Sequence, residues 1–171
     1  MEGGNMRIIV HDLCSPEWQA ANIPVAEQDV IVSDDGTLKN CIGCFGCWVK
    51  TPGICVIHDG YQHMGAYLGT ADTLLLISRN CCGSQSPFVK SVLDRSIGYI
   101  HPNFRTINGE MHHRKRFSNT LKLHAIFYGD QTDFEKNTAE ALVQAQAVNL
   151  AAKSVKVDFI DTLQQLSGVI A

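Results

Sequence analysis

A continuous apolar run, Thr73–Ser78, constrains the fold of this chain more than any other segment, and polar residues flank it on both sides. A strand with one face in water alternates apolar and polar residues, whereas a strand buried on both faces does not. The run therefore predicts a central strand covered by a layer on each side. Four other short segments have strand character, and they are Arg7–Val10, Asp29–Val32, Leu121–Tyr128 and Val155–Ile160.

Helical patterns separate the last three of these strands. The segment Ser86–Tyr99 carries apolar residues at helical spacing, and Thr132–Ala152 is rich in alanine and begins with the spacing of a capping box. Strands that alternate with helices pair in parallel through right-handed crossovers. We therefore predict an α/β fold of three layers around a five-stranded parallel sheet. Between the first two strands, Pro16 and Pro24 allow only a very short helix, or none.

The composition limits the classes of partner. The chain of 171 residues has the length of one domain, residues 1–171, and its 45% hydrophobic and 18% charged residues are ordinary for a globular protein. A net charge of -3 gives no basic excess that would favour nucleic acid. The apolar runs are far shorter than the ~20 residues of a membrane span, so we expect no membrane partner. The N-terminal residues lack the features of a secretion signal, and we therefore expect a cytoplasmic protein.

Four of the seven cysteines lie close together, from Cys41 through Cys44 and Cys47 to Cys55, with the spacing C-x2-C-x2-C-x7-C. This clustering, with an odd total, argues against disulfides and for metal or redox chemistry. Loops with such spacing give four thiolate ligands to [4Fe–4S] clusters. Two alternatives stay open, namely zinc with His58 as a substitute ligand and thiols that bind no metal.

The cysteine motif, continued by Gly53-x-Cys55 and Asp59, resembles that of the iron–sulfur flavoproteins and related NAD(P)H-dependent FMN reductases of the flavodoxin-like superfamily. The similarity covers about residues 29–153, including 71–84, 86–95, 108–113 and 127–130. It implies a flavodoxin-like sandwich with strand order 2-1-3-4-5. It also implies an FMN-dependent oxidoreductase or electron-transfer flavoprotein with NAD(P)H as donor, a [4Fe–4S] cluster, and homodimers or homotetramers.

In this family FMN lies against loops that follow three strands, which here correspond to 11–17, 79–85 and 128–130. The candidate cofactor-binding residues are therefore His11, Cys14, Ser15, Arg79, Asn80, Cys81, Cys82, Gly83, Ser84, Gln85, Tyr128, Gly129 and Asp130. The candidate metal ligands are Cys41, Cys44, Cys47 and Cys55. We assign no catalytic residue, because the flavin itself supplies the chemistry.

Two loops depart from the family pattern. The first commonly reads Gly-Ser-x-Arg in the family, whereas here it contains Asp12 and Glu17 and no arginine, which is electrostatically poor for a phosphate. Arg79–Cys82 stands where Ser-Pro-x-Tyr is common. The alternative hypothesis is therefore a flavodoxin-like oligomeric binding or structural protein that has lost FMN.

A long insertion, residues 98–118, connects a helix to the fourth strand. Compact domains rarely contain so long a connection without a function. It combines aromatic and apolar residues with the basic run His112–Arg116, a composition suited to burial against a neighbour. We predict an oligomer contact, or else a lid that presents Arg114 or Lys115 to a nicotinamide phosphate. A solvated basic loop is the alternative.

Overall fold

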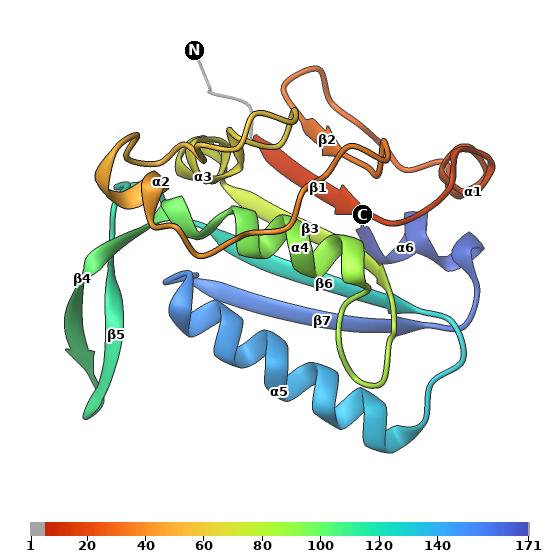
Figure 1. Cartoon of the computed structure of the whole chain (residues 1–171). Helices are drawn as coiled ribbons and strands as arrows, with labels where there is room; N and C mark the ends of the chain where they lie inside the picture. Colours follow the sequence, from red (N-terminus) through yellow and green to blue (C-terminus); the bar gives the residue numbers. More distant parts are fainter. Residues whose placement is uncertain (1–5, 171) are drawn as a thin grey trace, which may run out of the picture.

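A five-stranded parallel sheet forms the centre of the protein in a computed structural model that describes residues 6–170 (Figure 1). Its order is β2-β1-β3-β6-β7, which is 2-1-3-4-5 when the strands of this sheet are numbered along the chain. The predicted order is therefore confirmed. The strands are β1 (Arg7–His11), β2 (Val30–Val32), β3 (Thr73–Arg79), β6 (Lys122–Tyr128) and β7 (Ser154–Ile160).

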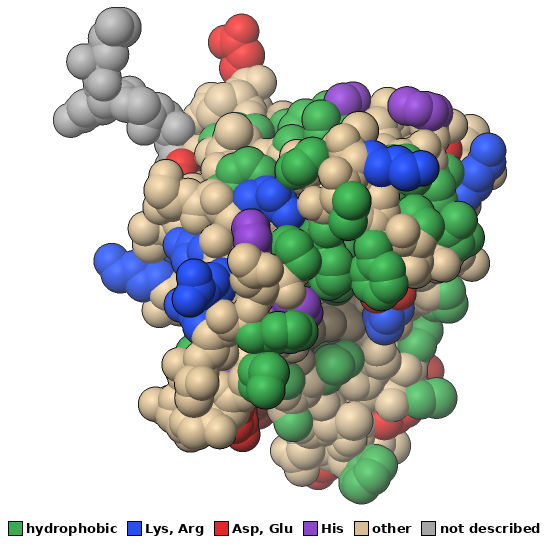
Figure 2. Space-filling model, turned by 60° about the vertical axis from the view of Figure 1, so that its left-hand side comes forward, with side chains coloured by type: hydrophobic (Ala, Val, Ile, Leu, Met, Phe, Trp, Pro, Cys, Tyr) green, Lys and Arg blue, Asp and Glu red, His purple; other side chains and the backbone are tan. Residues whose placement is uncertain are grey.

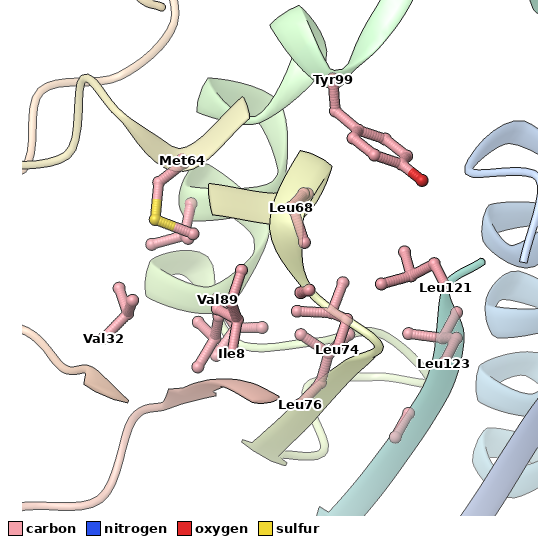
Figure 3. Close-up of a cluster of buried hydrophobic side chains, with 14 of the residues drawn as sticks. Ile8, Val32, Met64, Leu68, Leu74, Leu76, Val89, Tyr99, Leu121 and Leu123 are labelled. Carbon is pink, nitrogen blue, oxygen red and sulfur yellow. The ribbon is translucent and has the colours of Figure 1, made fainter. Parts of the chain in front are cut away.

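Helices cover both faces of the sheet, as the doubly apolar run predicted. Leu74 and Leu76 of β3 face one apolar cluster, while Leu75 and Ile77 face the other, and each is at most 2% exposed. Figure 3 shows the larger cluster, where side chains of the helices meet those of the sheet. The helices on that face are α3 (Met64–Thr70), α4 (Pro87–Arg95) and α5 (Asp133–Asn149), and those on the other are α1 (Ser15–Ala21), the 3-10 turn η2 (Leu163–Gln165) and α6 (Leu166–Ile170).

The helix boundaries follow the local signals. In α5 the predicted capping box is present, since the Glu135 amide donates to Thr132 Oγ1 at 3.3 Å and the Thr132 amide donates to Glu135 Oε2 at 2.8 Å. The first helix exists but spans only seven residues, with Pro16 in its first turn. The helix predicted over Ser86–Tyr99 is interrupted, because α4 ends at Arg95 and a short 3-10 turn, η1 (Ile97–Tyr99), follows.

The insertion 98–118 consists mainly of a β-hairpin, an element that the sequence analysis did not predict. β4 (Ile100–Ile107) and β5 (Glu110–Lys115) pair antiparallel in a separate two-stranded sheet. Asn108 and Gly109 join them with φ values of 51° and 85°, as a two-residue hairpin turn requires. The hairpin projects beyond the main sheet and lies beside α2 (Gly46–Val49) in Figure 1. Within residues 6–170, no helix is long and apolar enough to cross a membrane.

Candidate functional site

The three predicted flavin loops lie at one edge of the sheet, because each follows the carboxyl end of a parallel strand. Asp12, directly after β1, links them. Its carboxylate accepts hydrogen bonds from the Arg79 amide at 3.0 Å and from the Tyr128 hydroxyl at 2.9 Å. Its own amide donates to the carbonyl of Ile77 in β3 at 3.3 Å. Asp12 therefore closes the crevice between β1 and β3, a position that sequence reasoning marked only as an unfavourable charge.

The loop 79–85 forms a tight turn. The amides and carbonyls of Cys81 and Ser84 exchange two hydrogen bonds, and Cys82 and Gly83 adopt positive φ. Gly83 lies so close to α5 that a Cβ atom would approach the Thr138 side chain to 2.6 Å. Gln85 is buried and exchanges amide hydrogen bonds with Gln146 of the same helix. Gly83 and Gln85 thus hold the turn against α5, and the exposed members are Arg79 and Cys82.

Burial and the Asp12 carboxylate set the protonation of neighbouring groups. Burial, followed by Asp12, raises the pKa of Tyr128, so its hydroxyl remains a donor to that carboxylate. The same two causes raise the pKa of the Cys81 thiol, which therefore stays protonated at neutral pH. The Arg79 guanidinium lies over the Tyr128 ring, 5.1 Å from its centroid. This edge therefore contains neutral donors, one carboxylate that is already hydrogen-bonded, and one exposed cation.

The first loop continues into α1 with a second carboxylate. Glu17 Oε2 accepts the Cys14 amide at 2.8 Å, and this hydrogen bond lowers the pKa of Glu17. His11 is buried and stacks on Trp18, with 4.0 Å between ring centroids, and burial lowers its pKa so that it is neutral. Cys14 and Ser15 are exposed at the start of α1. The predicted residues of this loop thus have different roles, since His11 packs against Trp18 while Cys14 and Ser15 face solvent.

A flavin phosphate does not fit this loop. In sheets of this order FMN binds at the point where the strand order reverses, between β1 and β3, and phosphates bind where a following helix begins. Asp12 bridges that point, and Glu17 accepts the amide that opens α1. A dianionic phosphate there would meet two carboxylates, whereas the uncharged flavin ring would not be repelled in this way.

The four cysteines of the motif line a second region, a small hollow of about 30 Å³. Cys41 and Cys44 are exposed, Cys47 lies in α2, and Cys55 is buried beyond it. Burial, followed by the proximity of the other three thiols, raises the pKa of Cys47. As they stand, however, the described side chains include no group of three or more His, Cys, Asp or Glu residues arranged to hold a metal ion.

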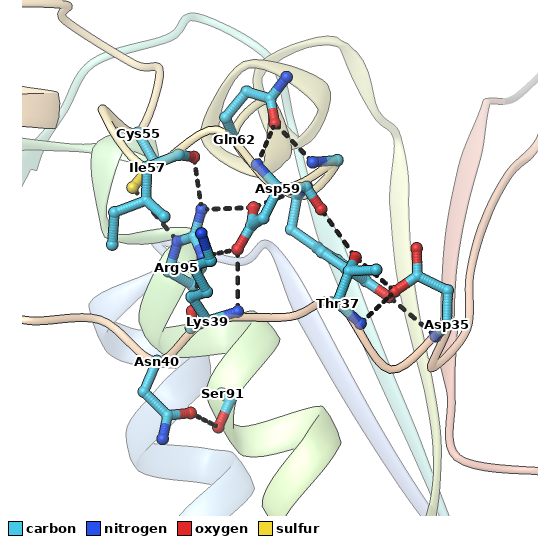
Figure 4. A network of polar contacts seen from close by, with 12 residues as sticks. Asp35, Thr37, Lys39, Asn40, Cys55, Ile57, Asp59, Gln62, Ser91 and Arg95 are labelled. Carbon is cyan, nitrogen blue, oxygen red and sulfur yellow. Dashed lines mark hydrogen bonds and ion pairs between the residues drawn. The ribbon is translucent and has the colours of Figure 1, made fainter.

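Arg95, at the end of α4, ties the two ends of the cysteine loop together (Figure 4). Its guanidinium donates to the carbonyls of Lys39 and Ile57, at 2.6 and 3.0 Å, and forms two bonds with the Asp59 carboxylate. Its fifth donor, Nε, lies 3.2 Å from Cys55 Sγ. All five donors are thus satisfied in a side chain that is fully buried. The adjacent carboxylate, Asp94, binds Lys90 instead.

Apolar side chains are exposed beside the cysteine loop, on the face shown in Figure 2. Aromatic contacts connect α2 to the hairpin, from Phe45 through Trp48 and His113 to Phe104. We call this region the apolar face and define it by its exposed members Ile42, Phe45, Val49, Ile97, Phe104 and Met111. Other apolar residues of 98–118 belong to the core instead, since Tyr99 and Ile100 are buried and Phe117 packs against them.

The basic run His112–Arg116 is a strand and its end rather than a solvated loop. The side chains of Arg114, Lys115 and Arg116 donate to the main-chain carbonyls of Phe104, Asn119 and Gly98, respectively. These hydrogen bonds attach the hairpin to itself and to the chain segments that precede and follow it.

Several solved structures share this fold. An NAD(P)H:quinone oxidoreductase from Methanothermobacter marburgensis matches 96% of the chain over 94% of its own, with a TM-score of 0.59 and 13% identity. An FMN-dependent NADH-azoreductase from Bacillus anthracis str. Ames Ancestor, solved in complex with FMN, matches 95% of the chain over 93% of its own, with a TM-score of 0.56 and 10% identity. Smu.1420 from Streptococcus mutans UA159 matches 96% of the chain over 98% of its own, with a TM-score of 0.57 and 10% identity. No family model and no curated protein sequence matches the chain. The strand order and these likenesses define a flavodoxin-like α/β fold.

Proposed function

We propose that this protein is an oxidoreductase that uses a bound flavin and takes electrons from NAD(P)H. The observation that carries the proposal is the convergence of 11–17, 79–85 and 128–130 at the point of the sheet where this fold binds FMN. The names of two structural neighbours, an FMN-dependent NADH-azoreductase and an NAD(P)H:quinone oxidoreductase, support it. The flavin would accept a hydride and pass on electrons, while the protein binds and orients it.

The residues of the chain would contribute by holding the cofactors in place rather than by reacting themselves. The turn 81–84 is held rigidly against α5, so its exposed thiol, Cys82, has a fixed place at the edge. Tyr128 is fixed by its hydrogen bond to Asp12, and Arg79 by its contact with the Tyr128 ring. The exposed guanidinium of Arg79 is the group at this edge best suited to attract an anionic nicotinamide cofactor.

We also propose a [4Fe–4S] cluster on Cys41, Cys44, Cys47 and Cys55. The four thiols line one hollow, and crowded thiolates repel one another unless a metal compensates their charge. Binding requires the exposed Cys41 and Cys44 to turn inward, because the side chains are not yet arranged around an ion.

Replacing Cys44→Ala tests the cluster. We expect anaerobically purified protein to contain about four iron and four sulfide per chain, and the variant to lose them while keeping its circular dichroism spectrum. Cys14→Ala, another exposed cysteine outside the motif, is the matched control. Native protein without iron or sulfide contradicts the cluster, and stoichiometric zinc would favour the alternative with His58.

A second candidate function follows from the Asp12 and Glu17 carboxylates. They favour a flavodoxin-like protein that has lost FMN and serves as a binding or structural module. The visible spectrum separates the two functions. Flavin bands that persist after flavin addition and desalting, and that bleach with NADH or NADPH, support the oxidoreductase. A colourless preparation under every one of these conditions supports the module.

We further propose that the protein forms a homodimer or homotetramer through the apolar face. Large side chains such as Val49 and Met111 are 78% and 72% exposed there, and the hairpin extends the surface beyond the sheet. Contiguous exposed apolar groups of this kind mark interaction surfaces.

A further inference from the structure

The Asp12 carboxylate occupies the hydrogen-bond donors at the place where a flavin phosphate would bind. Its two carboxylate oxygens hold donors from two different strands, the Arg79 amide and the Tyr128 hydroxyl. Phosphate groups bind by accepting such donors. A phosphate can reach this place only by displacing Asp12 or by lying against its negative charge.

Glu17 has a similar effect one turn further along the chain. It accepts the Cys14 amide, the donor that would face an anion at the start of α1. The helix behind it has only seven residues, so its dipole adds little. Arg79 is near enough to lower the pKa of Glu17. The positive charge of Arg79 is thus partly compensated by Glu17 already.

A hollow adjoins this loop, and its lining within residues 6–170 contains a carboxylate but no side chain with a fixed positive charge. It has a volume of about 440 Å³ and lies between the β1–α1 loop, α1 and the end of β2. Among the residues that the structure describes, no lysine or arginine lines it. Its polar side chains include the hydroxyls of Ser15 and Ser33, the amide of Gln19 and the carboxylate of Asp34. Hydroxyl, amide and carboxylate groups suit the uncharged hydroxyls of a sugar alcohol, and the Asp34 carboxylate repels an anion.

We infer that this edge selects a flavin without a terminal phosphate, of the riboflavin class, over FMN. The inference rests on the proposed function, because it specifies which flavin that function uses. Asp12 and Glu17 are its specificity-determining residues, and they act by excluding the phosphate rather than by contacting the ring.

Flavin titration of the purified full-length protein tests this selection. Quenching of flavin fluorescence gives dissociation constants for riboflavin and for FMN at low and at high salt. We expect riboflavin to bind more tightly than FMN at low salt. Added salt should strengthen FMN binding relative to riboflavin binding, because it screens the repulsion of the phosphate.

Two variants that each remove one negative charge test whether Asp12 and Glu17 weaken FMN binding. Asp12→Asn and Glu17→Gln each keep an oxygen that accepts the main-chain amide, and each should strengthen FMN binding about tenfold while changing riboflavin binding less than twofold. Glu27→Gln is the matched control, since it removes the same charge from an exposed residue outside the site and should leave the ratio unchanged.

The outcomes separate the two claims. If FMN binds the native protein as tightly as riboflavin or more tightly, the selection is overturned and the oxidoreductase proposal stands. If neither flavin binds native protein that melts cooperatively, the oxidoreductase proposal itself is overturned, and the selection with it. If the ratio of the FMN and riboflavin dissociation constants does not change in Asp12→Asn or Glu17→Gln, these carboxylates do not set the specificity.

Discussion

At the scale of single residues, the decisive contacts join positions that are distant in the sequence. Arg95 pairs with Asp59 rather than with its neighbour Asp94, because a helical residue cannot turn back to bind the residue before it. Asp12 acquires its role only when three strands align at one edge. The sequence indicated the loops through the family resemblance and the cysteines through their spacing, but it could not show which side chains would satisfy which donors.

The Asp59–Arg95 pair gives a prediction for stability. Replacing Asp59→Asn leaves the buried guanidinium without its counter-charge, and we expect a loss of about 3–5 kcal/mol in the free energy of unfolding, measured by urea denaturation. The matched control is Asp94→Asn, which breaks an exposed pair with Lys90 and should cost less than about 1 kcal/mol. Equal losses in the two variants would contradict a structural role for the buried pair.

The same pair predicts an acid transition. Hydrogen bonds from Arg95 lower the pKa of Asp59 from 3.8 to about 2. A carboxyl whose pKa is lower in the folded state stabilises the protein above the unfolded pKa, and that stabilisation is lost as the pH falls through the folded value. We therefore expect the free energy of unfolding to decline between pH 4 and pH 2 with a contribution that Asp59→Asn lacks. Parallel pH curves for native protein and variant would show that Asp59 does not contribute.

At the scale of elements, local periodicity predicted the sheet strands and main helices, because it reports which face of each element is buried. The hairpin β4–β5 was missed for the same reason. It packs little against the core, so its sequence lacks apolar alternation, and basic side chains cover it. The pair Asn108-Gly109, with both residues at positive φ, was the available signal.

The apolar face predicts association that depends on the hairpin. Phe104 lies in β4, half exposed, against His113, and Phe104→Glu places a charge in the middle of the face. We expect light scattering to show an oligomer for the native chain at micromolar concentration and a smaller species for the variant. Phe134→Glu, on the exposed first turn of α5 and outside the face, should not change the mass. A native chain that is monomeric contradicts the contact.

At the scale of the whole molecule, the two candidate sites lie at opposite ends of α4. The loop 79–85 leads into its first residue, and the cysteine hollow is lined by Arg95 at its last. Nine residues of helix separate them by about 13 Å. The organisation as a single domain and the cytoplasmic location stay predictions.

The spacing along α4 has a consequence for how such a protein changes over time. The residues that line the cysteine hollow include none from the three flavin loops, and the apolar contacts of α4 with the sheet involve side chains of neither region. A lineage can therefore change the residues of one end while the other end is maintained, because the two regions share no lining residue in the described part of the chain. The acidic first loop and the intact cysteine motif, present together in one chain, are the combination that such separable inheritance permits.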